Sequence, residues 1–418
     1  MVDTLFLTKL TTFRCRRCVR CSMFFIRLIH QIVEHKSFLM SHSIALLHSF
    51  FPKSLDYLIF LFIFVPDLAS LERLASNDNN NIKITIDMNK TILSTAVSAV
   101  LLFSMCSTTQ AKSWRINNDT SKGAKFTSIQ AATESELVTA GDTLFLDPGC
   151  TLTSQQVIKK RVTIIGCGYF RASTPHAFAT VTAPIAFDPG SSGSKLESLI
   201  CTGEYISIYV DNITIERCRT RRIQNTNSSS NCVIRQCYVE GPIQRSYGTI
   251  NAWTVENCIC FDGISNLQNS TVQNNFIWYN SNGAPLYDLQ NTIVRNNVII
   301  NNYNKNSIFS SLTDCTKDYN VISAESKTNE HDIALNSTNI GDVFTNTGNN
   351  DELYKLKEGS PAIGAGLNGV DCGPTGGNFP YVYGGMPAYH PYYTNAVISP
   401  KDDGTGVNVS LKILMQNE

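Results

Sequence analysis

The chain has 418 residues, with 34 Lys and Arg side chains and 34 Asp and Glu side chains. With 43% hydrophobic residues it has ample material for a core, and its composition excludes wholesale disorder, a collagen-like repeat and a protein with many membrane spans. The zero formal charge argues against a nucleic-acid-binding protein, which would carry a basic excess. Residues 1–111 hold 11 basic and 7 acidic side chains, which leaves 23 and 27 in the remainder, so the two parts have net charges of +4 and −4.

Residues 88–111 read MNKTILSTAVSAVLLFSMCSTTQA, the pattern of a secretory signal peptide. Lys90 supplies the positive end, an apolar run follows, and small residues precede a cleavage site after Ala111. The apolar run is shorter than the roughly 20 residues of a membrane span. Because a signal peptide acts at an N-terminus, we expect translation to begin at Met88 and residues 1–87 to be mis-assigned upstream sequence without function. The protein is then secreted, periplasmic or at the cell surface; lipidation at Cys106 is an alternative.

A strand-like phrase recurs in the second half at intervals of 17 to 23 residues, the length of one coil in a solenoid. The phrases are ITIERC, CVIRQC, WTVENC, STVQNN, TIVRNN and CTKDYN, ending at Cys218, Cys237, Cys258, Asn275, Asn297 and Asn320. In the first five, a β-branched apolar residue stands three places before the last residue. In the last five, an apolar residue follows two places after it. Because these two columns lie five residues apart, alternation along one strand cannot bury both, so a bend near the aligned residue is expected.

The aligned residue is Cys in the first three phrases and Asn in the last three. A buried Asn column is stable if each amide bonds the next coil's amide or the backbone of a bend. Cys can occupy the same inward position without a strong partner. Exported proteins usually pair their cysteines, and ten follow residue 111. The ladder nevertheless favours free buried thiols, with one or more disulfides as the alternative.

The two ends of the repeat carry the most specific patterns. Residues 126–132 predict a short helix with a capping box of Thr127 and Gln130. The segment IQAATESELVTAGDTLFLDPGCTLT, followed by KRVTIIGCG, resembles the opening of secreted right-handed parallel β-helix proteins of the pectate-lyase-like superfamily. LYKLKEGSPAIGAG and GGNFPY, which begin at residues 353 and 376, resemble the closing segment of such proteins, especially from Bacteroidetes.

This resemblance covers about residues 115–385 and implies an all-β fold, a single-stranded right-handed parallel β-helix (solenoid) with an N-terminal capping helix. We expect the β-helix domain to span residues 112–385. A small C-terminal β appendage is expected at residues 386–418, because the sequence alternates from Val407 to Leu414. Fold alone does not specify activity.

Many families on this fold handle acidic polysaccharides, which the resemblance therefore implies as ligands. Lyases of this kind need carboxylates that bind Ca²⁺ and a basic residue, and hydrolases need paired carboxylates. The motifs Asn-Thr-Asp and Gly-His-Gly of polygalacturonases and Arg-x-Pro-x-x-Arg of pectate lyases are missing from the sequence. Catalysis therefore stays open.

The remaining candidates are basic residues on two successive coils, acidic residues in the later parts of coils, and aromatic rings. The predicted substrate-binding residues are Arg219, Arg221, Arg222, Arg245, Trp278 and Tyr279. Candidates for catalysis are Arg235, Asp262 and Asp288, and candidates for a calcium site are Glu240, Asp262 and Asp288. Arg beside carboxylates could hold an acidic sugar directly or through Ca²⁺, and aromatic faces suit sugar rings. The alternative is that these are turn residues that keep a long surface soluble.

A polar stripe stands two places before the ladder residues: Glu216, Arg235, Glu256, Gln273 and Arg295. Opposite charges on neighbouring parallel strands compensate one another, and the alternative is that the stripe forms part of a ligand groove. The sequence thus predicts a monomeric exported protein that engages polysaccharide along its solenoid, without nucleic-acid partners or a membrane span after Ala111. It would act either as a lyase or hydrolase, or as a non-catalytic glycan-binding or adhesin-like protein.

Overall fold

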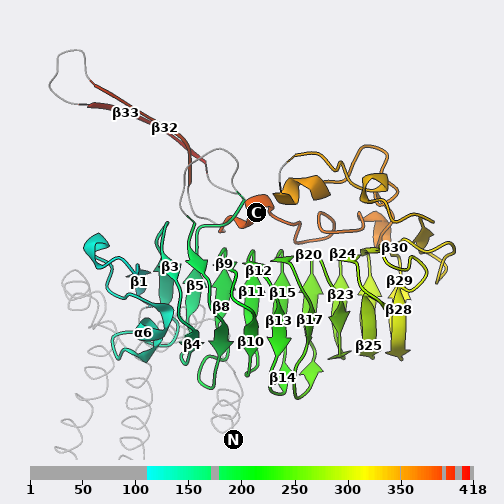
Figure 1. Ribbon diagram of the computed structural model, residues 1–418, viewed down its shortest axis with the longest axis horizontal. Coiled ribbons are helices and arrows are strands. Elements are labelled where there is room, and N and C mark those ends of the chain that lie inside the picture. Colours follow the sequence, from blue (N-terminus) through cyan, green and yellow to red (C-terminus); the bar gives the residue numbers. More distant parts are fainter. Residues whose placement is uncertain (1–110, 171–177, 349, 388–391, 401–406, 415–418) are drawn as a thin grey trace, which may run out of the picture. The chain divides into compact units, whose positions relative to one another are not determined.

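The computed structural model describes residues 111–170, 178–348, 350–387, 392–400 and 407–414. Residues 1–87 and the predicted signal peptide up to residue 110 lie outside these ranges. The described chain up to residue 387 is a parallel β-solenoid, whose short strands follow one another along one axis (Figure 1). The predicted all-β, right-handed parallel β-helix is therefore confirmed.

Three sheets run along the solenoid. Sheet A contains β1 (Ser113–Ile116), β2 (Thr143–Leu146), β5 (Thr163–Ile165), β8 (Lys195–Glu197), β11 (Thr214–Glu216), β15 (Val233–Arg235), β19 (Thr254–Glu256), β23 (Thr271–Gln273), β26 (Ile293–Arg295) and β29 (Thr316–Asp318). Sheet B contains β3 (Thr151–Leu152), β6 (Thr180–Val181), β9 (Ile200–Cys201), β12 (Arg219–Thr220), β16 (Tyr238–Val239), β20 (Ile259–Cys260), β24 (Phe276–Tyr279), β27 (Val298–Asn301), β30 (Val321–Ile322) and β31 (Ile333–Ala334).

Sheet C contains β4 (Gln156–Ile158), β7 (Ile185–Phe187), β10 (Ile206–Ile208), β13 (Ile223–Asn225), β17 (Ile243–Arg245), β21 (Ile264–Ser265), β25 (Leu286–Gln290) and β28 (Phe309–Thr313). A side branch of it contains β14 (Ser229–Ser230), β18 (Ile250–Asn251) and β22 (Leu267–Gln268), and joins at β25. All pairings in the three sheets are parallel, and each strand meets its neighbour one coil away. Side chains of one type therefore stack in columns along the axis.

The core follows from these columns. Ile215 pairs with Ile234, which pairs with Val255, and all three are fully buried. Their β-branched side chains suit the pleated, inward face of a strand.

The corner between sheets A and B contains the predicted bend. One residue before each ladder position the backbone is left-handed, with φ between 53° and 58°, at Ser198, Arg217, Gln236, Asn257, Asn274, Asn296 and Tyr319. Asn adopts this conformation at lower cost than most residues. The bend lets Ile215 before it and Thr220 after it both face inward, although they lie five residues apart.

The ladder itself is hydrogen-bonded as predicted. The backbone N–H groups of Cys258, Asn275 and Asn297 each donate to the side-chain oxygen of the next rung's Asn, at 2.9 to 3.1 Å. At the last rung, the backbone N–H of Asn320 donates to the buried carboxylate of Asp332 at 2.8 Å. Asn297 Nδ2 also donates to the carbonyl of Val272. Every buried amide in this half therefore has partners.

The cysteine half of the ladder is held more weakly. The thiol of Cys237 donates to backbone carbonyls of Ile215 and Arg235 at 3.4 and 3.2 Å. Cys150, Cys201, Cys218, Cys232, Cys237, Cys258, Cys260, Cys315 and Cys372 are free, which agrees with the prediction of unpaired thiols. Burial raises the pKa of Cys218, Cys237 and Cys258 well above that of an exposed thiol, so these thiols stay protonated.

A short helix packs against the first strand of sheet C. Helix α6 (Ile129–Glu134) follows Ser128, whose hydroxyl accepts a backbone N–H in the first turn. The predicted capping box at Thr127 is therefore wrong by one residue: Ser128 has the extended backbone that precedes the turn. The N–H of Gln130 donates to Gln156 Oε1 of β4, which ties the helix to the end of the sheet.

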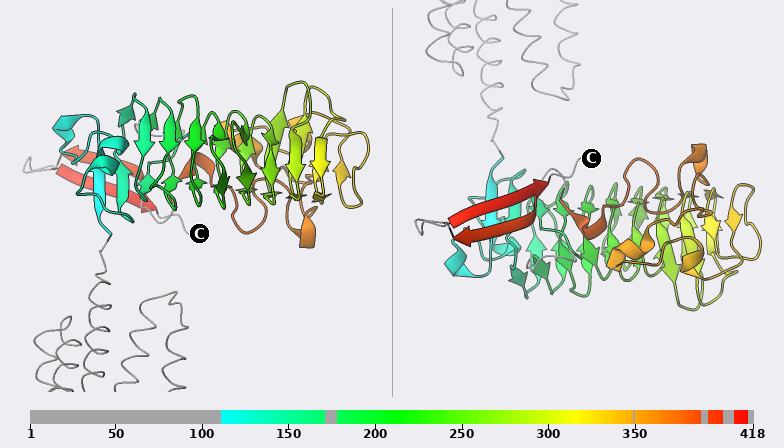
Figure 2. Two further views of the ribbon diagram at one scale, coloured as in Figure 1. Left: turned by 90° about the horizontal axis from the view of Figure 1, so that it is seen from below. Right: turned by 90° about the horizontal axis from the view of Figure 1, so that it is seen from above.

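After β31 the chain is irregular and lies along the outside of the coils (Figure 2); residues 335–348 and 350–387 are here called the C-terminal segment. The 3₁₀ turns of the described chain are η1 (Thr120–Lys122), η2 (Ile340–Asp342), η3 (Asn350–Tyr354), η4 (Leu367–Gly369) and η5 (Tyr383–Gly385). This segment covers the outer face of sheet B with a second apolar cluster, in which Phe276 and Val298 contact Phe344 and Tyr354. The outer face of sheet B is thus part of a buried core.

The chain ends in an antiparallel hairpin, β32 (Tyr392–Pro400) and β33 (Val407–Leu414). This is the small β tail that the alternating sequence predicts. In the described parts of the chain, no helix has the length and hydropathy of a membrane span.

Candidate ligand-binding cleft

Residues 364–386, here called the strap, run along the corner between sheets A and B. Side-chain amides from the left-handed corner positions donate to strap carbonyls. These hydrogen bonds are Gln236 Nε2 to Pro380 O at 2.6 Å, Asn257 Nδ2 to Pro374 O at 2.9 Å and Gly376 O at 2.6 Å, and Asn274 Nδ2 to Asp371 O at 3.2 Å. On the next coil Asn296 accepts the N–H groups of Leu367 and Gly373, so the strap is fixed to four successive coils without any strand pairing.

A buried polar network anchors the end of the strap. The hydroxyls of Tyr169 and Tyr381 lie 2.8 Å apart, and Tyr381 donates to the carboxylate of Asp351 at 3.1 Å. The N–H of Gly384 donates to the same carboxylate oxygen at 2.7 Å. Burial raises the pKa of Asp351 above its usual value, while these two donors oppose the rise. The network links the strap to an early coil and to η3.

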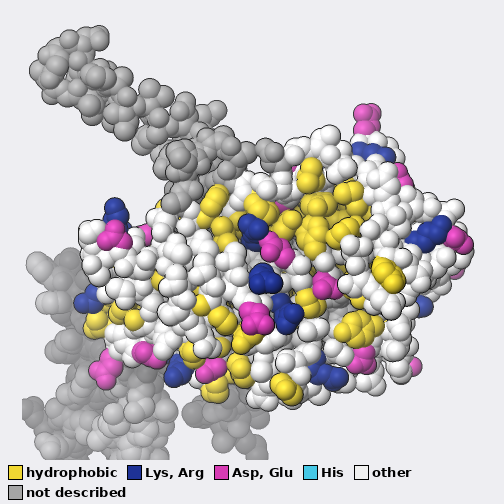
Figure 3. Space-filling view, viewed as in Figure 1, with side chains coloured by type: hydrophobic (Ala, Val, Ile, Leu, Met, Phe, Trp, Pro, Cys, Tyr) yellow, Lys and Arg dark blue, Asp and Glu magenta, His cyan; other side chains and the backbone are white. Residues whose placement is uncertain are grey.

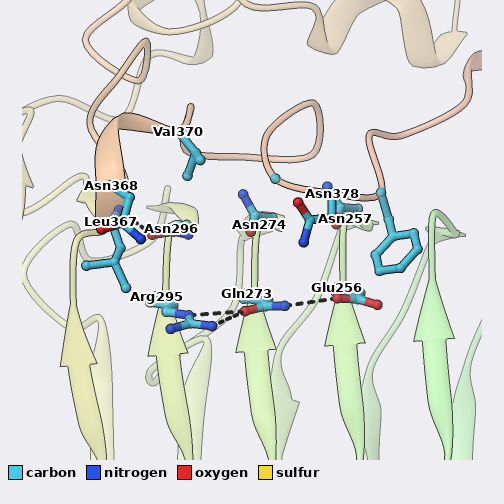
Figure 4. A pocket seen from close by; sticks show the side chains of 12 residues that line it. Glu256, Asn257, Gln273, Asn274, Arg295, Asn296, Leu367, Asn368, Val370 and Asn378 are labelled. Carbon is cyan, nitrogen blue, oxygen red and sulfur yellow. Dashed lines mark hydrogen bonds between the residues drawn. The ribbon is translucent and has the colours of Figure 1, made fainter.

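A cleft of about 230 Å³ lies between the strap and sheet A (Figure 4). Glu256, Gln273 and Arg295 form a row across the ends of β19, β23 and β26. The corner residues Asn257, Asn274 and Asn296 each follow one of them by one position in the sequence. The lining consists of Glu256, Gln273 and Arg295, the corner residues Asn257, Asn274 and Asn296, and the strap residues Leu367, Asn368, Val370, Gly377, Asn378 and Phe379.

The row of side chains on the cleft floor is joined by hydrogen bonds (Figure 4). Arg295 donates from Nε and Nη2 to Gln273 Oε1 at 3.1 and 3.0 Å, and Gln273 Nε2 donates to Glu256 Oε2 at 2.9 Å. Arg235 Nε lies 3.1 Å from Glu256 Oε1, as an ion pair without aligned hydrogen-bond geometry. The Arg235 guanidinium also lies 3.9 Å from the ring centroid of Phe379 at the rim. The charge of Glu256 is therefore compensated within the protein.

The predicted charge stripe is confirmed, but its ion pairs are not all formed between neighbouring rungs. Arg235 pairs with Glu256, but Glu216 pairs with Lys195 at 2.9 Å and with Arg217 at 3.6 Å. The predicted alternation of charge over three rungs is present, because Arg235 stands in register with both Glu216 and Glu256, although Lys195 and Arg217 form the ion pairs of Glu216. Both interpretations of the stripe apply: its charges compensate one another, and its second half lines a cleft.

The predicted substrate-binding arginines lie on different faces. Arg219 on sheet B pairs with Glu240 at 2.7 Å, and its guanidinium lies 4.6 Å from the ring centroid of Phe170. Arg221 and Arg222 follow β12 in the turn toward sheet C, where Arg221 is exposed and Arg222 half-buried. Both stand outside the cleft lining.

The predicted carboxylates are likewise distributed over different faces. Arg245 and Asp288 are on sheet C, with Nη2 and Oδ2 3.7 Å apart. Asp262 lies in the turn after β20, where it accepts the N–H of Gly263. Among the described residues no three or more His, Cys, Asp or Glu side chains are placed to hold a metal ion. Glu240, Asp262 and Asp288 are therefore not brought together as a group of three carboxylates.

The predicted aromatic platforms belong mostly to packing. Trp278 is half-buried against the apolar cluster on sheet B, with its ring centroid 6.2 Å from that of Phe261. Tyr279 is 8% exposed, so the prediction of an exposed ring there is wrong: its hydroxyl donates to Asn282 O in the following turn. Trp253 is fully buried, as expected. Figure 3 shows interleaved basic and acidic side chains on one face, beside hydrophobic side chains that gather over the C-terminal segment above β20 and β24.

Sequence reasoning missed the Asn residues of the cleft wall. Asn257, Asn274 and Asn296 each stand one place before a ladder residue, so their regular spacing was visible in the sequence. Their role was not, because it depends on the strap, which lies between 71 and 119 residues further along the chain in these contacts.

A comparison with protein-family models finds no match for this chain, and comparisons with curated proteins and with solved structures find none either. The fold therefore follows from the strand pairing, and the more specific resemblance to the pectate-lyase-like superfamily stays a prediction.

Proposed function

We propose that this protein is exported and binds polysaccharide, without cleaving it, in the cleft between the strap and sheet A. The observation that supports this function is the composition of the cleft. Amide groups, one carboxylate and one guanidinium surround it, and the ring of Phe379 is 41% exposed at the rim. Sugars offer hydroxyls that both donate and accept hydrogen bonds, and apolar faces that stack on aromatic rings.

Binding is favoured over catalysis by the number of carboxylates. A glycoside hydrolase places two of them on either side of the scissile bond. The lining has one, Glu256, which is held by Gln273 and Arg235. The one basic residue of the lining, Arg295, donates from Nε and Nη2 to Gln273 Oε1, so these groups are engaged within the protein rather than placed as the base of a lyase. A lyase or hydrolase is the alternative that the experiment below must test.

Export is proposed from the pattern of residues 88–111. The resemblance to secreted parallel β-helix proteins agrees with carbohydrate as the ligand. Sequencing the N-terminus of the protein isolated from its source tests this part: the proposal requires a mature chain that begins at Lys112. A chain that begins at Met1 and is retained in the cytoplasm would contradict it.

The binding function is tested with the full-length protein on a glycan array, followed by titration calorimetry with the best glycan. Phe379→Ala is expected to weaken binding about tenfold, equivalent to about 1.4 kcal/mol. Tyr303→Ala, which removes a ring that is 63% exposed outside the cleft, is the matched control and should leave the Kd unchanged. Circular dichroism confirms that both variants are folded.

Each outcome is decisive for the proposal. Binding that depends on Phe379, without release of new reducing ends or unsaturated sugars, supports it. Glycan turnover would replace it with the enzyme alternative. Absence of binding across the array, or equal binding by Phe379→Ala and the wild type, would overturn it.

A further inference from the structure

We infer that the cleft selects a neutral, hydroxyl-rich sugar over one that carries a carboxylate. This inference rests on the proposed binding function and names the class of sugar. The first observation is the charge of the lining: Glu256 and Arg295 are its two charged residues, and all others are amides or apolar. The cleft thus has no net charge to attract an anion.

Glu256 disfavours an acidic ligand. Its side chain lies on the cleft floor, and the residue is 5% exposed. Arg235 compensates it at 3.1 Å, and the same guanidinium stacks on Phe379. Arg235 is therefore engaged on two sides, and it stands outside the cleft lining, so it does not add a second cation to the cleft. A carboxylate brought beside Glu256 would meet a like charge at low local dielectric.

Arg295 is poorly placed to attract a carboxylate. The strongest contact of arginine with a carboxylate uses two parallel N–H groups. In Arg295 the Nε and Nη2 groups, which form one such pair, both donate to Gln273 Oε1 at 3.1 and 3.0 Å. On the next strand Asp318 stands in register with Arg295, which adds a negative charge on that side. This pair of Arg295 donors is therefore already used by Gln273 and is not available to a ligand carboxylate.

The amide groups of the cleft supply both donors and acceptors. Asn296 Oδ1 accepts the N–H of Leu367, which leaves its NH₂ as a donor. Asn257 uses its NH₂ on the strap, which leaves its Oδ1 as an acceptor. Among the described residues, the side chains of Asn368 and Asn378 make no hydrogen bond within the protein.

A hydroxyl can satisfy such a mixed set because it donates one hydrogen bond and accepts others. An ionised carboxylate accepts only, so it would leave Asn257 Oδ1 without a donor from the ligand. Desolvated acceptors without partners cost free energy. The hydrogen-bond balance and the charge balance therefore favour the same class, a neutral sugar.

The test compares two probe sets on the full-length protein: neutral oligosaccharides (xylo-, cello- and mannohexaose) and the uronate oligosaccharide hexagalacturonate. The array of the preceding section supplies any further neutral probe. Titration calorimetry at 50 and 500 mM NaCl should give a neutral-sugar Kd that changes less than about twofold with salt, since no ion pair with the ligand is screened. Hexagalacturonate should bind at least about tenfold more weakly.

Two variants and a control locate the selectivity. Glu256→Gln should strengthen hexagalacturonate binding several-fold and leave neutral-sugar binding within about twofold. Glu240→Gln, the same change in an ion pair on sheet B, should alter neither Kd. Because Glu256 is buried, Asn378→Lys is the second variant: it adds a cation at an exposed rim position and should also strengthen uronate binding.

Tighter binding of hexagalacturonate than of every neutral glycan, or uronate affinity unchanged in both variants, would overturn the inference and leave the proposed binding function intact. Absence of binding to either class on the array would overturn the proposed function itself, and the inference with it.

Discussion

The outer faces of sheets A and B follow the same coils but differ in chemistry. On sheet A the outward residues near the strand ends include Arg235, Glu256, Gln273 and Arg295, which contact one another and leave a cleft beneath the strap. On sheet B the outward column is mostly apolar and is covered by the C-terminal segment: Tyr238, Ile259, Phe276, Val298 and Val321. The C-terminal segment therefore buries the outer face of sheet B, whereas it leaves a cleft between itself and sheet A.

The difference shows what decides between a sealed and an open face. A solenoid repeats position, so one residue type in each coil becomes a row along the axis. An apolar row is stabilised by removing it from water, which draws the covering segment into contact. A polar row whose members satisfy one another gains little from being covered. The strap is consequently held beside sheet A by a few amide hydrogen bonds and leaves space for a ligand.

The largest predicted effect is a loss of stability when the apolar contacts on the outer face of sheet B are removed. Phe276 is fully buried, with ring centroids of Phe344 and Tyr354 at 4.6 and 5.1 Å. Phe276→Ala should lower the free energy of unfolding by about 3–5 kcal/mol, because it removes buried contacts and leaves a cavity. Guanidinium-induced unfolding measures this loss. Ile293→Ala on the outer face of sheet A, where Ile293 is 40% exposed, should cost about 0.5 kcal/mol. Equal losses would mean that the two faces do not differ as described.

The second prediction concerns the corner that joins the two faces. Asn297→Ala removes a donor to Val272 O at 3.0 Å and the acceptor for Asn275 N–H at 2.9 Å, both inside the core. Unsatisfied buried groups make this substitution cost about 2–3 kcal/mol. Cys237→Ala removes a ladder residue whose sulfur makes only weak contacts, so its loss should be smaller. The prediction fails if chemical unfolding shows Cys237→Ala to be as destabilising as Asn297→Ala.

The sequence was sufficient for the features that repeat within one coil. The columns around Cys258 and Asn297 predicted the solenoid, the bend and the ladder, because each rung reports on the same local geometry. The row of Arg235, Glu256 and Arg295 was predicted for the same reason.

Two kinds of feature were not predictable in this way: the sheet to which a residue outside the repeated phrase belongs, and contacts between segments that are far apart in the sequence. Arg219 and Arg245 lie on successive coils but in different sheets, B and C, so they are on different faces of the solenoid. The cleft required the strap, and Asn257 contacts Pro374 across 117 residues. Nothing in the local pattern of either segment specifies the other.

The third prediction loosens the strap without disturbing the coils. Asn257 is 2% exposed, has a φ of 54° and holds two strap carbonyls. Asn257→Gly keeps the left-handed backbone accessible and removes both hydrogen bonds, at a cost of about 1–2 kcal/mol. Hydrogen exchange should accelerate at the amides of residues 364–386.

The matched control for this variant is Asn269→Gly. Asn269 also has a left-handed backbone, with a φ of 49°, but its side chain bonds Asn251 and Asn291 on neighbouring coils rather than the strap. It should leave exchange in the strap unchanged. Slow exchange in the strap of Asn257→Gly would show that the apolar cluster, and not the amides, fixes it.

The smallest predicted effect on stability comes from an ion pair at β29, the last strand of sheet A. His331 Nδ1 lies 2.7 Å from Asp318 Oδ2, and its ring stacks on Tyr319 with centroids 4.3 Å apart. The hydrogen bond to Asp318 raises the pKa of His331, and desolvation only partly opposes it. The pKa of Asp318 is lowered because hydrogen bonds from His331 and from two backbone N–H groups outweigh its desolvation.

The raised pKa of His331 contributes stability that is complete below the unfolded value of about 6.5 and is lost as the pH rises through the folded value. The lowered pKa of Asp318 contributes stability that is present above about 3.8 and is lost as the pH falls through its folded value. The pair therefore stabilises the fold between these limits, and by little, because it is exposed. NMR titration should give His331 a pKa above 6.5 that returns toward it in Asp318→Asn. A value at or below 6.5 in the wild type would mean that the charged pair does not form, and that the polar row of sheet A ends at Arg295.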